Sequence, residues 1–230
     1  MIAIRIVCAF TLLALFAPST LWAQSALTGG TKENLDLPFD AIGENEEEED
    51  APEVVTFYGT QLEGDGFFYI IDRSGTMQSV GELQRAKQEV IKNITEFSER
   101  VQFGVFFFDA GLTKFPSSGQ PADANPAMKA SGISYVSSTP GGGGTCPQAA
   151  LLAALRMSQQ ASAKRKVIVF LSDGHANCSG AGEDTYKAAT LAAVSGSNFQ
   201  RAVINTIGVL EVLDETFMRS LAASNGGTYT

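Results

Sequence analysis

Four runs of nearly continuous apolar residues predict buried β-strands at 67–71, 101–108, 167–171 and 202–209. Strands without polar alternation are typical of parallel sheets whose two faces are covered by helices. Between them, apolar residues recur at steps of three and four and predict helices over about 81–98, 147–160, 183–194 and after Asp214. This alternation favours an α/β fold with a doubly wound, mostly parallel sheet.

Weaker signals surround these elements. Short edge strands are expected at 54–58 and 113–116, a helical turn is expected from Pro126, and GGTYT at the end of the chain is expected to enter one more strand.

The first 23 residues form a separate segment. Arg5 precedes an apolar stretch of about 12 residues, and Pro18 and small residues lead to Ala23. A membrane-spanning helix needs roughly 20 apolar residues, so residues 1–23 are predicted to be a cleaved signal peptide. We expect an exported protein, secreted or periplasmic, with no membrane span after cleavage; retention as an N-terminal membrane anchor is the alternative.

Acidic residues are concentrated in the next segment. Residues 24–55 hold ten of the 25 acidic residues and one basic residue, Lys32, and they include the run ENEEEED. This composition predicts a disordered acidic linker. The domain expected over 56–230 has 15 acidic and 14 basic residues, which excludes the basic surface typical of nucleic-acid binding.

Three loops carry oxygen-bearing side chains at the ends of the predicted elements. Asp72, Ser74 and Thr76 follow the first strand in DRSGT, Thr145 follows four glycines at the start of a helix, and Asp173 follows the strand VIVFL. Ligands of open α/β sheets bind at the carboxyl edge of the strands. Two carboxylates and three hydroxyls are hard donors that suit Mg²⁺, Mn²⁺ or Ca²⁺, and Mg²⁺ characteristically keeps waters and an open coordination position.

These three motifs in this order resemble the metal-ion-dependent adhesion site (MIDAS) of von Willebrand factor type A (vWA) domains. The resemblance covers about residues 66–230. It implies that the hydroxyls of Ser74, Thr76 and Thr145 contact the metal, while Asp72 and Asp173 act through water or by orienting the hydroxyls. It also implies a non-enzymatic, metal-dependent binding module of the adhesion type, whose protein partner offers an Asp or Glu carboxylate.

Two departures from the family pattern affect what is expected. Thr76 stands where the family usually has a second serine, which keeps the hydroxyl but restricts its rotamers. The sequence ends at Thr230, where family members normally continue into a final helix. We therefore expect the usual final helix to be missing and an apolar strip of the sheet to be uncovered, available to a partner or a second copy.

Two alternatives stay open. DRSGT also resembles the D-x-D-G-T loop of haloacid dehalogenase-like phosphatases, in which Asp72 would be the nucleophile; Ser74 replaces the second aspartate, and the glycine loop has no role there. The other alternative is a structural vWA domain that binds no metal and whose polar loops only cap strands and helices.

Cys146 and Cys178 are the cysteines beyond the predicted signal peptide. Cys146 follows Thr145, and Cys178 lies five residues after Asp173. If both loops flank one metal, the two thiols share a rim, and a disulfide between them is predicted in an oxidising compartment.

Overall fold

The computed structural model describes residues 51–178, 180, 182–210 and 213–230. Its main element is a six-stranded sheet in the order β5-β4-β3-β7-β8, with β6 paired to β4. The strands are β3 (Gly66–Asp72), β4 (Gln102–Phe108), β5 (Leu112–Phe115), β6 (Ala122–Asp123), β7 (Lys166–Ser172) and β8 (Val203–Gly208). The pairs among β4, β3, β7 and β8 are parallel, whereas β5 and β6 run antiparallel to β4. This mostly parallel sheet confirms the predicted α/β class.

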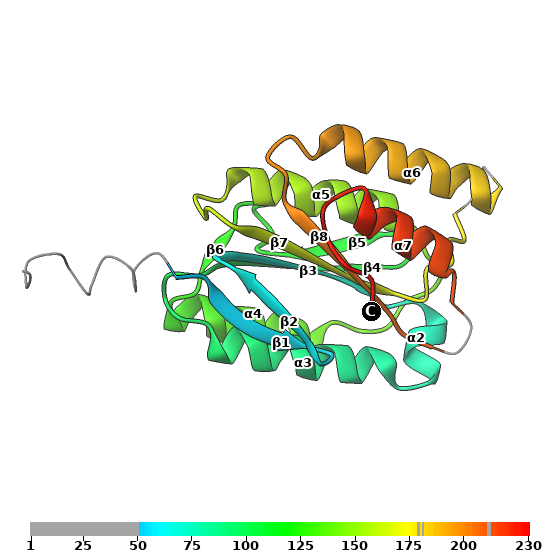
Figure 1. Ribbon diagram of the computed structural model, residues 1–230. Helices are drawn as coiled ribbons and strands as arrows, with labels where there is room; N and C mark the ends of the chain where they lie inside the picture. The colour runs from blue at the N-terminus through cyan, green and yellow to red at the C-terminus, as the bar shows by residue number, and fades with distance from the viewer. Residues whose placement is uncertain (1–50, 179, 181, 211–212) are drawn as a thin grey trace, which may run out of the picture. The chain divides into compact units, whose positions relative to one another are not determined.

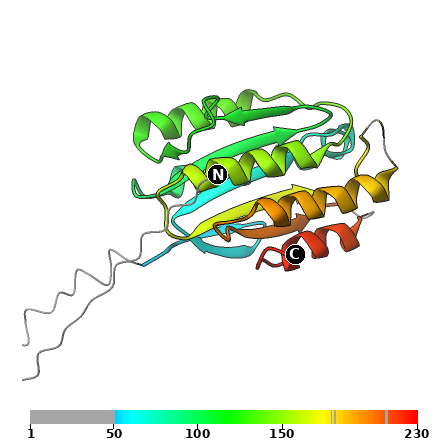
Figure 2. The ribbon, with the colours of Figure 1, turned by 90° about the horizontal axis from the view of Figure 1, so that it is seen from above.

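Helices cover both faces of the sheet (Figures 1 and 2). The helices are α2 (Gly75–Ser79), α3 (Glu82–Glu96), α4 (Pro126–Ser138), α5 (Pro147–Gln160), α6 (Glu183–Ser197) and α7 (Glu215–Ala223). The two faces bury separate clusters of apolar residues, one beneath α2, α3 and α4 and the other beneath α5, α6 and α7. Because the side chains of a strand alternate between faces, a strand buried by helices on both sides is apolar throughout.

The three central strands end together at one edge. Ile71 of β3 is in register with Phe107 of β4 and with Leu171 of β7. Since all three strands run parallel, the residues that follow them emerge at the same edge of the sheet. The DRSGT and SDG motifs are therefore neighbours in space although about 100 residues separate them.

A β-hairpin precedes the main sheet and corrects one prediction. β1 (Glu53–Phe57) and β2 (Thr60–Gly64) pair antiparallel in a separate two-stranded sheet, so 54–58 is not an edge strand of the main sheet. Its inward residues Val55, Phe57 and Leu62 are buried in the same cluster as residues of β7 and β8. The apolar face expected to be uncovered is thus occupied by this hairpin.

Surface exposure supports the same correction. Ile207 of β8 and the face of β7 that meets the hairpin are nearly fully buried. In the part of the chain that the structure describes, the exposed large apolar side chains are Val54, Val80, Phe199 and Val203. Val54 and Val203 lie on β1 and β8, whereas Val80 and Phe199 lie in the turns after α2 and α6. These residues are not the continuous apolar strip of sheet that was expected.

The remaining elements follow the predictions with shifted bounds. The helical turn expected from Pro126 is the full helix α4, capped by Asn125, whose side chain accepts a hydrogen bond from the Met128 amide. Where one more strand was expected at the end of the chain, the structure has an isolated parallel bridge between Tyr229 and Thr206 of β8. β1 begins at Glu53, three residues before the predicted domain boundary. The predictions for residues 1–50 lie outside the described residues. Among the residues that the structure describes, no helix is long and apolar enough to cross a membrane.

Candidate metal centre

The three loops that carry the five predicted donors are joined by backbone hydrogen bonds at the carboxyl edge of the sheet. The Gly142 amide donates to the Arg73 carbonyl at 2.8 Å, which joins the glycine loop to DRSGT. The Asn177 amide donates to the Thr145 carbonyl at 2.9 Å, which joins the glycine loop to the segment after Asp173. Backbone hydrogen bonds therefore hold the loops together independently of any side-chain ligand.

Asp72 lies at the base of this site and is completely buried. Its Oδ1 accepts from the Ser74 amide at 2.7 Å and its Oδ2 accepts from the Ser172 hydroxyl at 2.8 Å. Burial raises the pKa of this carboxyl to about 6, although the hydrogen bonds from Ser74 and Ser172 lower it. Within the described residues Asp72 makes no ion pair, so its negative charge has only neutral donors as partners.

This geometry does not suit the phosphatase alternative. A nucleophilic carboxylate must present an oxygen to the substrate in line with the scissile bond. Asp72 has no exposed surface, and each of its oxygens accepts a hydrogen bond from the protein. Its position is that of a group that orients other residues.

Above Asp72, three predicted donors form a hydrogen-bonded row. The hydroxyls of Ser74 and Thr76 are 3.1 Å apart, and the Thr76 hydroxyl donates to Asp173 Oδ2 at 3.2 Å. The other carboxylate oxygen of Asp173 accepts from the His175 amide at 3.0 Å. Thr76 fills the position of the second serine with its hydroxyl directed at the other donors.

Backbone contacts position Thr145 beside the loop that follows Asp173. It is 8% exposed and forms an isolated bridge with Asn177. The next residue, Cys146, is joined by a disulfide to Cys178, and the Cα atoms of the pair are 5.3 Å apart. This Cα separation lies in the range of disulfide-bonded cysteines, and the bond fastens the Thr145 loop to the loop after Asp173.

The glycines before Thr145 allow close packing. A Cβ atom on Gly142 would lie 1.9 Å from Asp109 Oδ2, and Gly144 has a φ of +76°. Asp109 in turn forms an ion pair with Arg73 at 3.0 Å and its carbonyl accepts from the Cys146 amide at 2.7 Å. The glycines let the loop approach this pair closely, which side chains would prevent.

Ser172 is a site residue that the sequence analysis did not assign. Its hydroxyl donates to Asp72 and accepts from the Gly174 amide at 3.1 Å, so it links the two aspartate loops. The sequence feature that could have indicated Ser172 is its position at the end of β7, directly before Asp173. Glu183, the first residue of α6, is a second such residue. Its carboxylate accepts a hydrogen bond from the Ala176 amide at 3.1 Å, which holds the loop after Asp173 against α6, and it forms an ion pair with Lys187.

The donor set fits a hard divalent cation. In the described part of the chain no three His, Cys, Asp or Glu side chains cluster as a metal site, and here the two carboxylates are supplemented by hydroxyls. A buried carboxylate whose partners are neutral is stabilised by a nearby cation. Ser74, Thr76 and Thr145 are the residues that would hold the ion, with Asp72 and Asp173 orienting them.

Burial of Asp72 predicts how the stability of the metal-free chain depends on pH. The folded carboxyl has a pKa of about 6, against 3.8 for the ordinary group, so the folded state binds the proton more tightly than the unfolded state. The stabilisation is complete below pH 3.8 and is lost as pH rises to about 6, which amounts to about 3 kcal/mol. Urea unfolding in a chelator should show this decline relative to an Asp72→Asn chain; parallel curves for the two chains would contradict it.

A family model and a curated protein match the chain. The family described as the von Willebrand factor type A domain matches residues 67–175. Human inter-alpha-trypsin inhibitor heavy chain H4 is 26% identical over 166 residues, which cover 69% of this chain and 17% of that protein. The chain thus spans a small part of that relative.

Solved structures agree on the fold. A von Willebrand factor type A protein from Catenulispora acidiphila has a TM-score of 0.63 and 21% identity, over 74% of this chain and 39% of that one. The pilus adhesin SpaC from Lactobacillus rhamnosus GG, in its open conformation, has a TM-score of 0.55 and 14% identity, over 78% of this chain and 28% of that one. The chain therefore contains a von Willebrand factor type A domain.

Proposed function

We propose that this vWA domain is a metal-dependent protein-binding module of the adhesion type. The observation that carries the proposal is the row of Ser74, Thr76 and Asp173 above the buried carboxylate of Asp72. The row presents hydroxyl oxygens at the carboxyl edge of the sheet, where ligands of α/β folds bind. Mg²⁺ is the cation expected, with Mn²⁺ and Ca²⁺ as substitutes.

The partner follows from the charge of such a centre. The hydroxyls that would contact the cation are neutral, and Asp72 and Asp173 would act from behind them. An Asp or Glu carboxylate from another protein could therefore complete the coordination sphere at the open position. The similarity of the domain to a pilus adhesin is in keeping with such a role, although at 14% identity it concerns the fold alone. We assign no catalytic role to the site, because Asp72 is enclosed by its hydrogen-bond donors.

The proposal includes export. Disulfides such as Cys146–Cys178 are typical of oxidising compartments, and the pattern of residues 1–23 is that of a signal peptide. Together these features favour a domain that works outside the cytoplasm.

Two measurements test the proposal in order. Isothermal titration of the native chain with MgCl₂, MnCl₂ and CaCl₂ at constant ionic strength should give saturable binding at one site. Immobilised chain should then retain Asp- and Glu-containing peptides from a random library in Mg²⁺ and release them in a chelator. An absence of saturable binding for all three ions would refute the metal site; metal binding without peptide retention would leave a structural cation and refute the adhesion role.

A further inference from the structure

A polar cavity lies beside the candidate metal centre, between the start of α3 and the end of α4. Its volume is about 360 Å³. Its wall is formed by Gln78 of α2, by the first turns of α3 as far as Lys87, and by residues 137–141. The last of these segments leads directly into the glycine loop before Thr145.

The cavity and the candidate metal centre share two loops. The Gln78 amide donates to the carbonyl of the predicted donor Ser74 at 3.1 Å. Gly141 lies so close to the Gln78 side chain that a Cβ atom on it would be 2.1 Å from Gln78 Oε1. The next residue, Gly142, donates to the Arg73 carbonyl. A polypeptide bound at the metal centre therefore has this cavity beside it.

Lys87 places a positive charge in the wall of this cavity. Its side chain is buried, and the residue is only 7% exposed. The ammonium group donates to the carbonyls of Thr139 and Ser137, the second at 3.4 Å. These carbonyls lie at the C-terminal end of α4, where a helix leaves carbonyl groups without helical partners. An ammonium has three N–H donors, so this cap of α4 accounts for two of them.

The charge of Lys87 has no carboxylate opposite it. No Asp or Glu is among the described residues that line the cavity. In the part of the chain that the structure describes, Lys87 forms no ion pair. Burial accordingly lowers the pKa of Lys87, as expected for an ammonium that is removed from water without an anionic partner.

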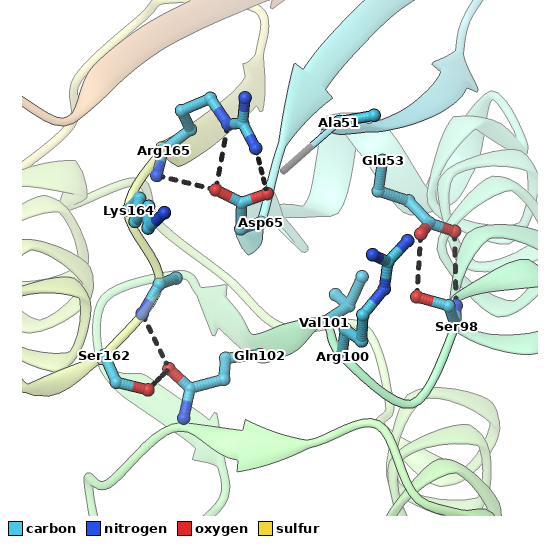
Figure 3. Close-up of a pocket in the computed structure, with 11 residues that line it drawn as sticks. Ala51, Glu53, Asp65, Ser98, Arg100, Val101, Gln102, Ser162, Lys164 and Arg165 are labelled. Atoms are coloured by element: carbon cyan, nitrogen blue, oxygen red, sulfur yellow. Dashed lines mark hydrogen bonds and ion pairs between the residues drawn. The ribbon is translucent and has the colours of Figure 1, made fainter. Parts of the chain in front are cut away.

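A cavity at the opposite edge of the sheet shows the contrast. Glu53 and Asp65 line it together with cationic residues, among them Arg165 (Figure 3). Asp65 accepts from Arg165 Nε and Nη2, at 2.9 Å each. That cavity carries negative charge in its own wall, whereas the cavity at Lys87 is lined by one cation and neutral groups.

We propose that the cavity at Lys87 binds a second carboxylate of the protein partner, beside the carboxylate that completes the coordination of the metal ion. The inference rests on the proposed adhesion function, and it makes the recognised feature a pair of acidic side chains. The second carboxylate accepts from the third N–H of Lys87, a charge-assisted hydrogen bond. The side-chain amides of Gln78 and Gln84 in the same wall can donate to it as well.

Sodium acetate tests the cavity without a metal ion or a partner. Acetate should shift the side-chain resonances of Lys87 and the amide resonance of Thr139 in the metal-free native chain, at constant ionic strength. Acetamide, which has the same shape and no charge, should not. Lys92, an exposed lysine of α3, supplies the reference resonances. Equal shifts with the two compounds, or equal shifts at Lys87 and Lys92, would overturn the proposal.

Paired peptides test the role of the cavity in partner binding. In MgCl₂, the native chain should bind the best peptide from a series with Asp and Glu at varied spacing about tenfold more tightly than the same peptide with Gln in place of Glu. Lys87→Met keeps an unbranched side chain without the charge. It should abolish this preference and leave the affinities for Mg²⁺ and for the one-acid peptide unchanged. Lys92→Met is the matched control and should keep the preference.

The failure of this proposal differs from the failure of the adhesion role. A native chain without the two-acid preference, or a Lys87→Met chain that keeps it, would show that Lys87 only caps α4 and would overturn the proposal. A native chain that binds Mg²⁺ and retains neither peptide would refute the adhesion role, and with it a second carboxylate from a partner, even where acetate shifts the Lys87 resonances. If Lys87→Met does not fold, the acetate titration and the peptide pair on the native chain still decide.

Discussion

The Asp72→Asn chain is expected to bind Mg²⁺ about 100-fold more weakly than the native chain while it keeps its fold. Asp72 supplies a full negative charge at the base of the site, and its oxygens hold the Ser74 amide and the Ser172 hydroxyl. Residues that orient metal ligands cost 10- to 100-fold in affinity when they are replaced. The loss of a buried charge that faces the cation places this substitution at the upper end of that range.

The fold should survive because asparagine keeps much of the bonding. Its amide oxygen can accept from the Ser74 amide as Asp72 Oδ1 does at 2.7 Å. Its amide nitrogen can donate to the Ser172 hydroxyl, which has a second acceptor position besides the one that the Gly174 amide uses. At neutral pH the substitution also removes a desolvated charge, so the metal-free variant should be at least as stable as the metal-free native chain.

Titration calorimetry with MgCl₂ and urea unfolding with and without MgCl₂ measure the two halves of this prediction. Asp123→Asn is the matched control, since Asp123 is an exposed aspartate of β6 that accepts from Gln102 at the other edge of the sheet. The control should keep native affinity. An Asp72→Asn chain with native Mg²⁺ affinity would remove Asp72 from the site, and one that fails to fold would show that its charge is needed for stability.

The central strands and most helices could be predicted because their signals are local. Each residue of β3 is buried, and an uninterrupted apolar run of this length is typical of a central strand in an α/β chain. Pro126 marked the start of α4 in the sequence, but the length of the helix was underestimated. Only Gly132 and Val136 of α4 are buried, so the helix lacks the apolar periodicity from which the other helices were predicted.

The cover of the sheet could not be predicted from local patterns. Val55, Phe57 and Leu62 alternate with polar residues, which correctly indicates strands with one buried face. That pattern does not say which surface the buried face contacts. Residues 54–58 were expected to be an edge strand of the main sheet, and an apolar strip of the sheet was expected to be bare. The packing of the hairpin on the sheet accounts for both errors.

The site donors were predictable because parallel strands bring their ends to one edge. Asp72 and Asp173 follow neighbouring strands, and that topology alone makes them neighbours. Ser172 was missed because its role depends on the direction of one side chain, toward Asp72 Oδ2. A serine beside an aspartate is too common in loops to indicate such a bond by itself.

Replacement of both Cys146 and Cys178 by serine is expected to lower the free energy of unfolding by about 3–4 kcal/mol. The two cysteines are 32 residues apart in sequence, and a cross-link that closes a loop of this size restricts the unfolded chain by about that amount. Urea unfolding of the oxidised native chain, the reduced native chain and the double variant measures the effect. The last two should agree, since both lack only the cross-link.

The same variant should bind Mg²⁺ roughly tenfold more weakly, because the Thr145 loop must then be ordered when the ion binds. The loss is smaller than for Asp72→Asn, since the Asn177 amide still donates to the Thr145 carbonyl and the Cys146 amide to the Asp109 carbonyl. Unchanged affinity after reduction would mean that these backbone bonds position Thr145 without the disulfide. An affinity loss as large as that of Asp72→Asn would mean that the loop has no other support, which the two backbone bonds argue against.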